Sequence, residues 1–241
     1  MKYKFITILC LLGIWQGLSL YINKEVILPL PYDVLLKMFT LASSSDFYIA
    51  IIMTLLRIML SFIIALVLGT LIGIIAGLYK PLDELLKPLI SLLHTIPQIT
   101  YILILLVWLQ STTALIVIIL LMIFPIFYHN SKYGIQQIKH DYQDILKIYY
   151  QPFSYNFIHV YLPLMKQYII SAIDTCLPLS IKVGVMSEIF VSSSYGIGRQ
   201  LYLARMQIDM TSIFAWTIWM VIIIMVINYI THYAMKHYIS S

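Results

Sequence analysis

"SFIIALVLGTLIGIIAG", residues 61–77, places a small residue at every fourth position of an otherwise bulky, mostly apolar run. This small-residue stripe consists of Ser61, Ala65, Gly69, Gly73 and Gly77. Lipid tails are as apolar as leucine, so helices associate in a bilayer through close packing, which small residues permit. The stripe rises about 24 Å along a helix, which is most of a hydrocarbon core about 30 Å thick. The stretch therefore predicts a membrane-spanning helix that a neighbouring helix contacts closely along nearly its full depth.

The composition of the whole chain also indicates a membrane protein. Of its 241 residues, 61% are apolar and 10% are charged, whereas soluble domains carry roughly 25% charged residues. Too few charges remain to cover a water-facing surface, so the sequence predicts an all-α integral membrane protein in a lipid bilayer. The formal net charge of +5 is then information about orientation and not a sign of nucleic-acid binding.

About six stretches are apolar and long enough for a transmembrane helix, which needs roughly 20 residues. They cover residues 3–22, a span within 47–79, and about 88–109, 113–128, 163–190 and 212–233. The first stretch is interpreted as an uncleaved span, since no small-residue cleavage site follows it. Lysine and arginine are more frequent in the connections on the side of both termini, which predicts that the N- and C-termini are cytoplasmic.

The predicted spans divide the chain into three parts. Residues 1–22 form an N-terminal transmembrane helix, residues 23–46 form an external loop with an amphipathic helix, and residues 47–241 form a core domain of five spans. The second span is long, so residues 47–56 either extend it or form a separate interfacial helix. Pro97 is expected to kink the third span.

Two connections between the core spans are large enough to form structure of their own. Residues 129–162 form the one sizeable cytoplasmic segment, where a short helix is expected over 141–150, ending before Pro152. Such a helix can dock into a groove of a partner protein, although a solvated linker is the alternative. The external connection contains Gly196 and Gly198, which are expected to form a flexible turn.

Four stretches resemble the permease subunits of ATP-binding-cassette importers, in the nitrate/sulfonate/taurine-type branch. They read "LPLPYDVL", "TLLRIMLSFIIALVLGTLIGIIAGLY", "KPLISLLHTIPQITYILILLVWL" and "SIKVGVMSEIFVSSSYGIGRQL". The resemblance extends from about residue 28 to the C-terminus and implies a type I importer permease fold in the plasma or inner membrane. It also implies a pair of permease copies, ATPase subunits on the cytoplasmic side, and an external binding protein that delivers a small solute.

The resemblance extends to the cytoplasmic signature through which such permeases couple to their ATPase subunits. Aligned from the Leu162–Pro163 pair, this chain has Asp, Ile, Leu and Tyr where the signature has Glu, Ala, Ala and Gly, and the proline after it would supply the helix break. The expected coupling residues are Asp144, Ile145, Leu146, Tyr150, Gln151 and Pro152. The chain has no GxxxxGK[ST] phosphate loop, so ATP is expected to be bound and hydrolysed by a partner, with no enzyme activity or cofactor in this chain.

Several ionisable residues fall within or near the predicted spans, where charge is costly and usually faces a cavity or the bundle interior. Lys182 and Glu188 match positions of the family and are expected to line or gate the pathway near its outer half. A lysine cation there would suit an anionic solute. The alternative is a structural ion pair or hydrogen bond within the bundle. Arg57 is expected at the outer membrane boundary, and His94 is expected to be packed in the bundle.

Other classes of protein find less support in the sequence. An intramembrane enzyme would need His, Asp or Glu residues clustered on facing helices, and no such cluster is evident in the sequence. His129, His140 and His159 lack the spacing of metal ligands. A non-transporting membrane scaffold or a diverged permease paralogue remains the alternative to a transport role, because the coupling signature is altered.

Overall fold

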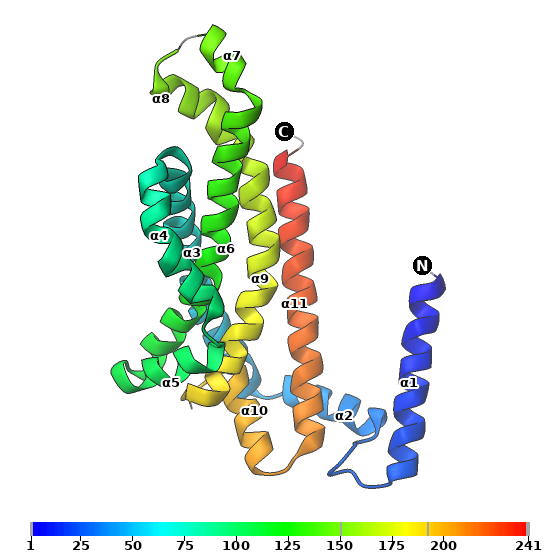
Figure 1. Cartoon of the computed structure of the whole chain (residues 1–241). Helices are drawn as coiled ribbons and strands as arrows, with labels where there is room; N and C mark the ends of the chain where they lie inside the picture. The colour runs from blue at the N-terminus through cyan, green and yellow to red at the C-terminus, as the bar shows by residue number, and fades with distance from the viewer. Residues whose placement is uncertain (1, 150, 192, 240–241) are drawn as a thin grey trace.

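The computed structural model describes residues 2–149, 151–191 and 193–239. All regular structure within these residues is helical, so the prediction of an all-α protein is confirmed. The helices run from α1 to α11 in chain order, with one short π-helical turn, η1, between α8 and α9. The long helices lie roughly parallel to one another (Figure 1).

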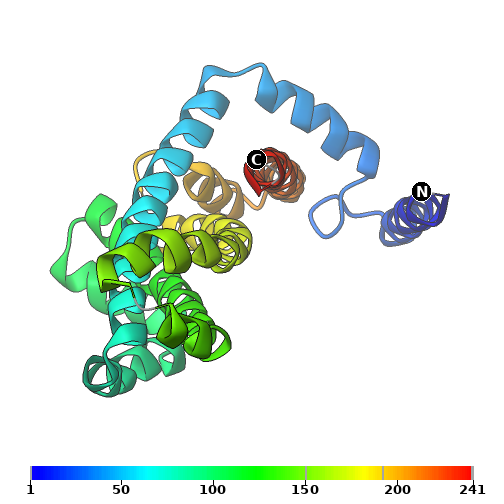
Figure 2. The same ribbon diagram turned by 90° about the horizontal axis from the view of Figure 1, so that it is seen from above.

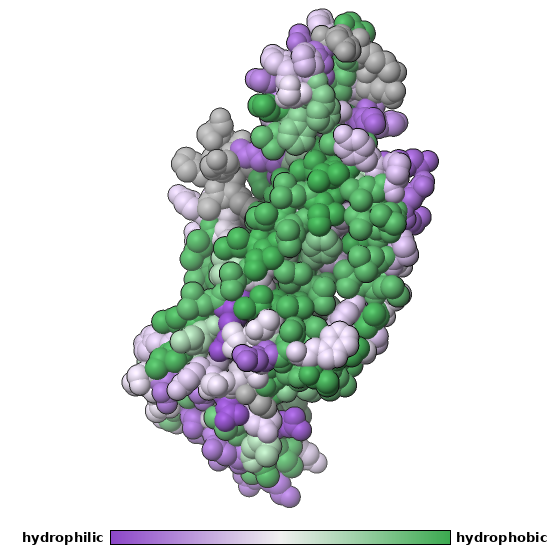
Figure 3. All heavy atoms as spheres, turned by 90° about the vertical axis from the view of Figure 1, so that its left-hand side faces the viewer, coloured by the Kyte–Doolittle hydropathy of each residue, from purple (hydrophilic) through white to green (hydrophobic). Residues whose placement is uncertain are grey.

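Four helical runs are long and apolar enough to cross a membrane. They are α3 (Ser45–Leu78), α6 (Ser111–Asp141), the run Phe153–Val191 that contains α9 (Leu162–Val191), and α11 (Met210–Ile239) over Met210–Tyr233. A hydrophobic band separates two more polar ends of the molecule (Figure 3), as expected where lipid tails surround a protein and water surrounds its ends. The prediction of an integral membrane protein is therefore confirmed.

Two further segments correspond to the remaining predicted spans. The helices α4 (Lys80–Thr95) and α5 (Gln98–Trp108) pass the length and hydropathy test only as a pair, and α1 (Lys2–Ile22) contributes a shorter apolar stretch, Leu9–Ile22. By length and composition the described residues thus contain four spans, or up to five if the bent pair is counted as one.

Pro97 has a larger effect than the kink expected from the sequence. The axes of α4 and α5 differ in direction by 100°, so the third predicted span is two helices and not one kinked helix. Ile96 is extended, with φ −71° and ψ 127°, because a following proline disfavours the helical conformation. Pro97 itself cannot donate a backbone hydrogen bond, and it becomes the residue that precedes α5.

The helix α3 settles the alternative left open for residues 47–56. It is one unbroken helix of 34 residues, about 51 Å long, so these residues extend the span and do not form a separate interfacial helix. The helix begins after Ser44, whose hydroxyl accepts a hydrogen bond from the Phe47 amide at 3.3 Å. The Phe47 ring is buried against Trp216 and Trp219 of α11, which ties the N-terminal end of α3 to the last helix.

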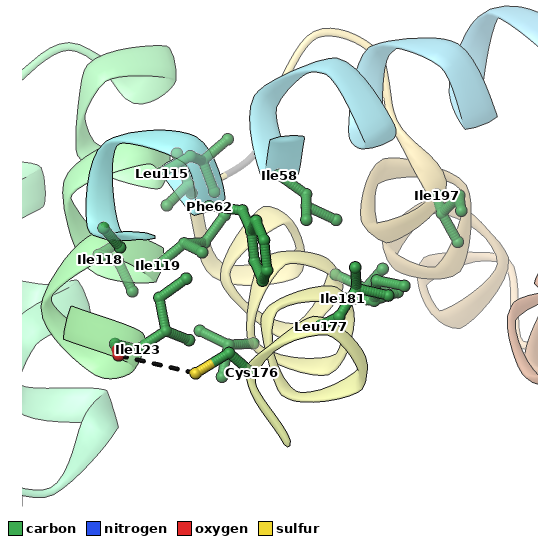
Figure 4. Packing of buried hydrophobic residues seen from close by; sticks show 14 of the residues in the cluster. Ile58, Phe62, Leu115, Ile118, Ile119, Ile123, Cys176, Leu177, Ile181 and Ile197 are labelled. Carbon is green, nitrogen blue, oxygen red and sulfur yellow. Dashed lines mark hydrogen bonds between the residues drawn. The ribbon is translucent and has the colours of Figure 1, made fainter. Parts of the chain in front are cut away.

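The main core lies where α3, α6 and α9 meet. Ile58 and Phe62 of α3, Ile119 of α6, and Leu177 and Ile181 of α9 are all buried there, and their side chains converge on a common interior (Figure 4). A buried apolar cluster of this kind is expected where three long helices pack against one another.

The segment before α3 contains the amphipathic helix predicted there. This helix, α2 (Pro31–Ala42), buries Val34 and Met38 against Ala215 of α11. It runs from the end of α1 past α11 to the start of α3 (Figure 2). The indole nitrogen of Trp15 on α1 donates to the Pro29 carbonyl at 3.1 Å, so a polar contact holds α1 at the start of α2.

The two ends of the bundle carry the short helices. One end holds α7 (Gln143–Ile148), α8 (Phe153–Asn156) and η1 (Phe157–Tyr161), and the opposite end holds α10 (Ile197–Met206) (Figure 1). The helix α6 continues without interruption to Asp141. The first part of the predicted loop 129–162 is therefore a helical extension of the span.

Candidate functional site

A buried carboxylate connects three helices near the end of the bundle that carries α10. The side chain of Glu188, on α9, is 2% exposed. The Thr54 hydroxyl of α3 lies 2.8 Å from its Oε2 atom, and the Arg57 guanidinium donates to Oε1 at 2.9 Å. The backbone amide of Gly198 donates to Oε2 at 3.0 Å. Glu188 thus takes part in an ion pair within the bundle, while its role in lining or gating a pathway stays a prediction.

The same two residues of α3 also hold the chain that leads into α10. The amide of Ile197 donates to the Thr54 hydroxyl at 2.9 Å, and Arg57 Nη1 donates to the Tyr195 carbonyl at 2.6 Å. Thr54 thus bridges a side chain of α9 and a backbone amide of α10. We refer to Thr54, Arg57, Glu188 and Gly198 as the outer polar cluster.

The glycines near this cluster do not form the flexible external turn expected from the sequence. Gly196 and Gly198 are buried, and Ile197 between them begins α10. Gly196 has φ 149°, a conformation that glycine adopts at little cost. A Cβ atom at Gly196 would lie 2.5 Å from Glu188 Oε2. The prediction of a flexible turn is therefore wrong, because the close approach to the carboxylate needs glycine and fixes the backbone.

The other charged residues of α9 are placed differently. The Lys182 and Asp174 side chains are exposed on the surface of the single chain. The structure brings Glu188 together with Arg57, while the role of Lys182 in lining a pathway stays a prediction. His94, expected to be packed in the bundle, is exposed, and its ring centroid lies 5.4 Å from that of His129 on α6.

Reasoning from sequence missed two members of the outer polar cluster. Thr54 gave no signal, because a threonine in an apolar helix commonly bonds to the carbonyl one turn earlier. The sequence predicts for Arg57 only a place at the membrane boundary. Its partner, Glu188, is 131 positions away in sequence, so no local pattern joins the two residues. The one usable signal was the presence of an arginine and a glutamate near the same predicted membrane face, since intramembrane charges usually pair.

The small-residue stripe lies against α6 of the same chain. A Cβ atom at Gly73 would lie 2.5 Å from the Tyr128 carbonyl oxygen, so the two backbones are in direct contact. At Gly69 and Gly77 the nearest atoms would be side-chain Cβ atoms of α6, at 2.6 and 2.8 Å. The glycines therefore permit a helix–helix approach that no larger residue allows without movement.

The remaining two members of the stripe are also buried. Ala65 and Ser61 are both 0% exposed. The Ser61 hydroxyl donates to the Arg57 carbonyl at 2.8 Å, so its polar group is satisfied within its own helix. Four members of the stripe are thus interior to one chain, and Gly77 is half-buried against α6, so a contact between two copies is not needed to cover the stripe.

The expected coupling residues lie at the end of the bundle opposite α10. Asp144, Ile145 and Leu146 belong to α7, while Gln151 and Pro152 precede α8. Tyr150 lies outside the described residues. The helix α7 ends at Ile148, so the helix expected over 141–150 is shorter. Pro152 directly precedes α8 and does not terminate α7.

Several large apolar side chains of α7 and of the residues that follow it are exposed. The exposed fraction is 53% at Ile145, 75% at Ile148, 72% at Tyr149 and 58% at Phe153. Leu146 instead packs against the cluster formed by α6 and α9. One side of α7 is thus anchored to the bundle, while the other presents an apolar surface at a polar end of the molecule.

Comparison with known proteins supports one family. A family model described as "Binding-protein-dependent transport system inner membrane component" matches residues 69–240, which is more than two thirds of the chain. The matched region begins within the small-residue stripe and includes the exposed segment between α6 and α9 as well as Glu188. No curated protein is similar enough in sequence to count as a match.

Proposed function

The chain belongs to the family of binding-protein-dependent transport inner membrane components, and from this premise we propose that it forms the translocation pathway of an ATP-binding-cassette importer. The family match over residues 69–240 carries the proposal. A permease of this kind supplies the membrane channel, while separate subunits bind and hydrolyse ATP. The solute would be small and would be delivered by an external binding protein.

The exposed segment from Asp144 to Pro152 is proposed to bind an ATPase subunit. It lies between two spans, at a polar end of the bundle, and presents Ile145 and Ile148 to the surroundings. Apolar side chains that remain exposed outside the membrane are costly in water and commonly mark interaction sites. A short helix with one anchored side and one apolar side suits insertion into a groove.

Co-purification tests this assignment. The full chain would be expressed with the ATPase and binding protein encoded beside it, and captured through a tag on the permease. We expect the ATPase to be retained by the unaltered chain and lost in Ile148→Asp, because a charge would be placed in an apolar contact. Tyr21→Asp is the matched control, since Tyr21 is 89% exposed at the other end of the bundle.

The outcome separates transport from the alternative function. If the unaltered chain retains no ATPase, and ATP hydrolysis does not respond to the binding protein, the chain is a membrane scaffold or a diverged paralogue. If Ile148→Asp retains as much ATPase as Tyr21→Asp, the coupling surface lies elsewhere.

The pathway is proposed to run along the α9 surface that carries Lys182, between two copies of the chain. The exposed lysine of one chain would face the partner copy and would favour an anionic solute through its charge. Uptake of the solute found in the binding protein should fall about tenfold or more in Lys182→Met and recover in Lys182→Arg. Unchanged uptake by Lys182→Met at normal expression would overturn this role.

Both termini are proposed to be cytoplasmic. The C-terminal end of α11 lies toward the end of the bundle that carries α7 (Figure 1), and the lysine distribution points the same way. A fluorescent protein fused to the C-terminus should therefore mature in the cytoplasm, and an exported reporter enzyme fused there should be inactive. Activity of the exported reporter would reverse the orientation.

A further inference from the structure

A basic cavity lies between α4 and α6, apart from the outer polar cluster and the coupling segment. Its volume is about 240 Å³. The polar and charged residues that line it are Asp83, Lys87, Ser91, His94, His129 and Lys132. They come from α4 and from the part of α6 that lies toward α7 (Figure 1). The remainder of the lining, Ile90 and the Tyr128 ring, is apolar or aromatic.

The charges of this cavity do not balance. Lys132 Nζ lies 2.7 Å from Asp83 Oδ1, and the Tyr128 hydroxyl donates to the same oxygen at 2.9 Å. The side chains of this ion pair are only 18% and 19% exposed, so Lys132 already neutralises the carboxylate. Lys87 adds a second positive charge, and Asp83 is the single carboxylate among the described lining residues. The cavity is therefore cationic even with neutral imidazoles.

Two imidazoles lie next to each other at the same cavity. The ring centroids of His94 on α4 and His129 on α6 are 5.4 Å apart. The charged groups around them are Lys87 and Asp83 on α4 and Lys132 on α6, while the adjoining residues of α3 are apolar. Each ring can donate an N–H group to a bound anion.

We propose that this cavity binds an oxyanion group of the phosphate type, carried by a free anion or by the headgroup of an anionic lipid. Lys87 supplies the unbalanced charge, His94 and His129 supply ring N–H donors, and Ser91 supplies a hydroxyl. The ion pair of Lys132 and Asp83 fixes the inner side of the cavity. The volume is several times that of one water molecule in the liquid, about 30 Å³, so an oxyanion group has room to enter.

Metal binding is a weaker explanation of the paired histidines. Among the residues that the structure describes, no three His, Cys, Asp or Glu side chains come together as metal ligands. The unbalanced charge of Lys87 at the same cavity would also repel a cation. The proposed site is independent of the direction and the substrate of transport, because only residues of α4 and α6 form it.

The test uses the full chain in lipid nanodiscs. In phosphatidylcholine discs, inorganic phosphate is titrated by calorimetry. In discs that also contain phosphatidylglycerol, the lipids that stay bound are counted by native mass spectrometry. We expect binding in at least one arm.

Variants distinguish the cavity from general surface charge. Lys87→Gln and, separately, His94→Gln should weaken binding about tenfold or more, the effect of losing one charge-assisted hydrogen bond. Lys80→Gln, an exposed lysine on the same helix that does not line this cavity, should bind as the unaltered chain does. Saturable phosphate binding identifies a free anion, and cavity-dependent retention of phosphatidylglycerol alone identifies a lipid headgroup. Binding in neither arm, or equal loss in Lys80→Gln, overturns the proposal.

Discussion

At the scale of single residues, Glu188 shows how a carboxylate can be kept inside a membrane bundle. Its two oxygens accept hydrogen bonds from a hydroxyl, a guanidinium and a backbone amide. Removing two charges from water is costly, and the cost is recovered only when the pair is well bonded. The pair therefore specifies how α3, α9 and α10 fit together, more than it adds net stability.

Glu188→Gln should destabilise the chain strongly. The amide keeps the volume but leaves the Arg57 guanidinium, which is 13% exposed, without a counter-charge, and breaking a buried pair costs about 3–5 kcal/mol. Thermal unfolding in detergent measures the effect. Glu84→Gln is the matched control, because its pair with Lys80 is long, at 3.8 Å, and exposed, and such pairs contribute about 0–1 kcal/mol. Equal shifts for the two variants would mean that the outer polar cluster has no special role.

Gly73→Ala should also be destabilising, although alanine is the better helix former. The new Cβ would lie 2.5 Å from the backbone oxygen of Tyr128, and relief of such overpacking costs about 1–3 kcal/mol. Gly17→Ala is the matched control, since nothing lies within 4 Å of its Cβ position, and this change should be neutral or stabilising by up to about 1 kcal/mol. Comparable unfolding temperatures would show that α3 and α6 separate easily.

At the scale of elements, the sequence predicts the long helices better than their breaks. Apolar length located α3, α6, α9 and α11, and the small-residue stripe located the surface of α3 that packs closely. The 100° bend at Pro97 was not predictable in this way, because proline can kink a helix or end it depending on the packing around it. The helix α10 was not predicted, because its segment is too polar to show a helical periodicity of apolar residues. Its position also depends on contacts with α3 that the sequence does not reveal.

At the start of α11, the Asp209 carboxylate caps the helix, and its contribution to stability can be tested. Asp209 accepts hydrogen bonds from the Ser212 amide at 2.8 Å and hydroxyl at 2.6 Å, which caps the helix, and Lys37 lies 3.4 Å away. Partial burial acts to raise the pKa of this carboxyl, but the hydrogen bonds and Lys37 outweigh burial and leave the pKa below its ordinary value.

The sign of the pH dependence follows from that lowered pKa. The carboxylate stabilises the folded chain at pH values above the ordinary pKa of aspartate, and this contribution is lost as the pH falls through the lowered value. Asp209→Ala should therefore cost about 1 kcal/mol near neutral pH, the usual worth of a helix cap, and less in acid. Unfolding measured in detergent across this range checks the trend, and a difference between the two chains that stays constant with pH would contradict it.

At the scale of the whole molecule, composition was enough to predict an integral membrane protein, but not the site chemistry. The residues of the outer polar cluster come from three helices far apart in the chain, and no local pattern joins Arg57 to Glu188. The cavity between α4 and α6 likewise needs two helices in register before its lysines and histidines share one space. Resemblance to a family located the segment proposed to bind an ATPase subunit, whereas its exposed apolar side chains could be seen only after the helices were placed.

The separation of Arg57 from Glu188 along the chain has a consequence for synthesis. Chains grow at about 5–20 residues per second, so the 131 residues between the two take about 7–26 seconds to make. During that interval α3 enters the bilayer with its guanidinium uncompensated, held near the headgroups by its flexible stem. Nascent chains arrested before Glu188 should thus insert α3 less completely than arrested Arg57→Met chains. Insertion of this first core helix would then be completed only after Glu188 has been synthesised.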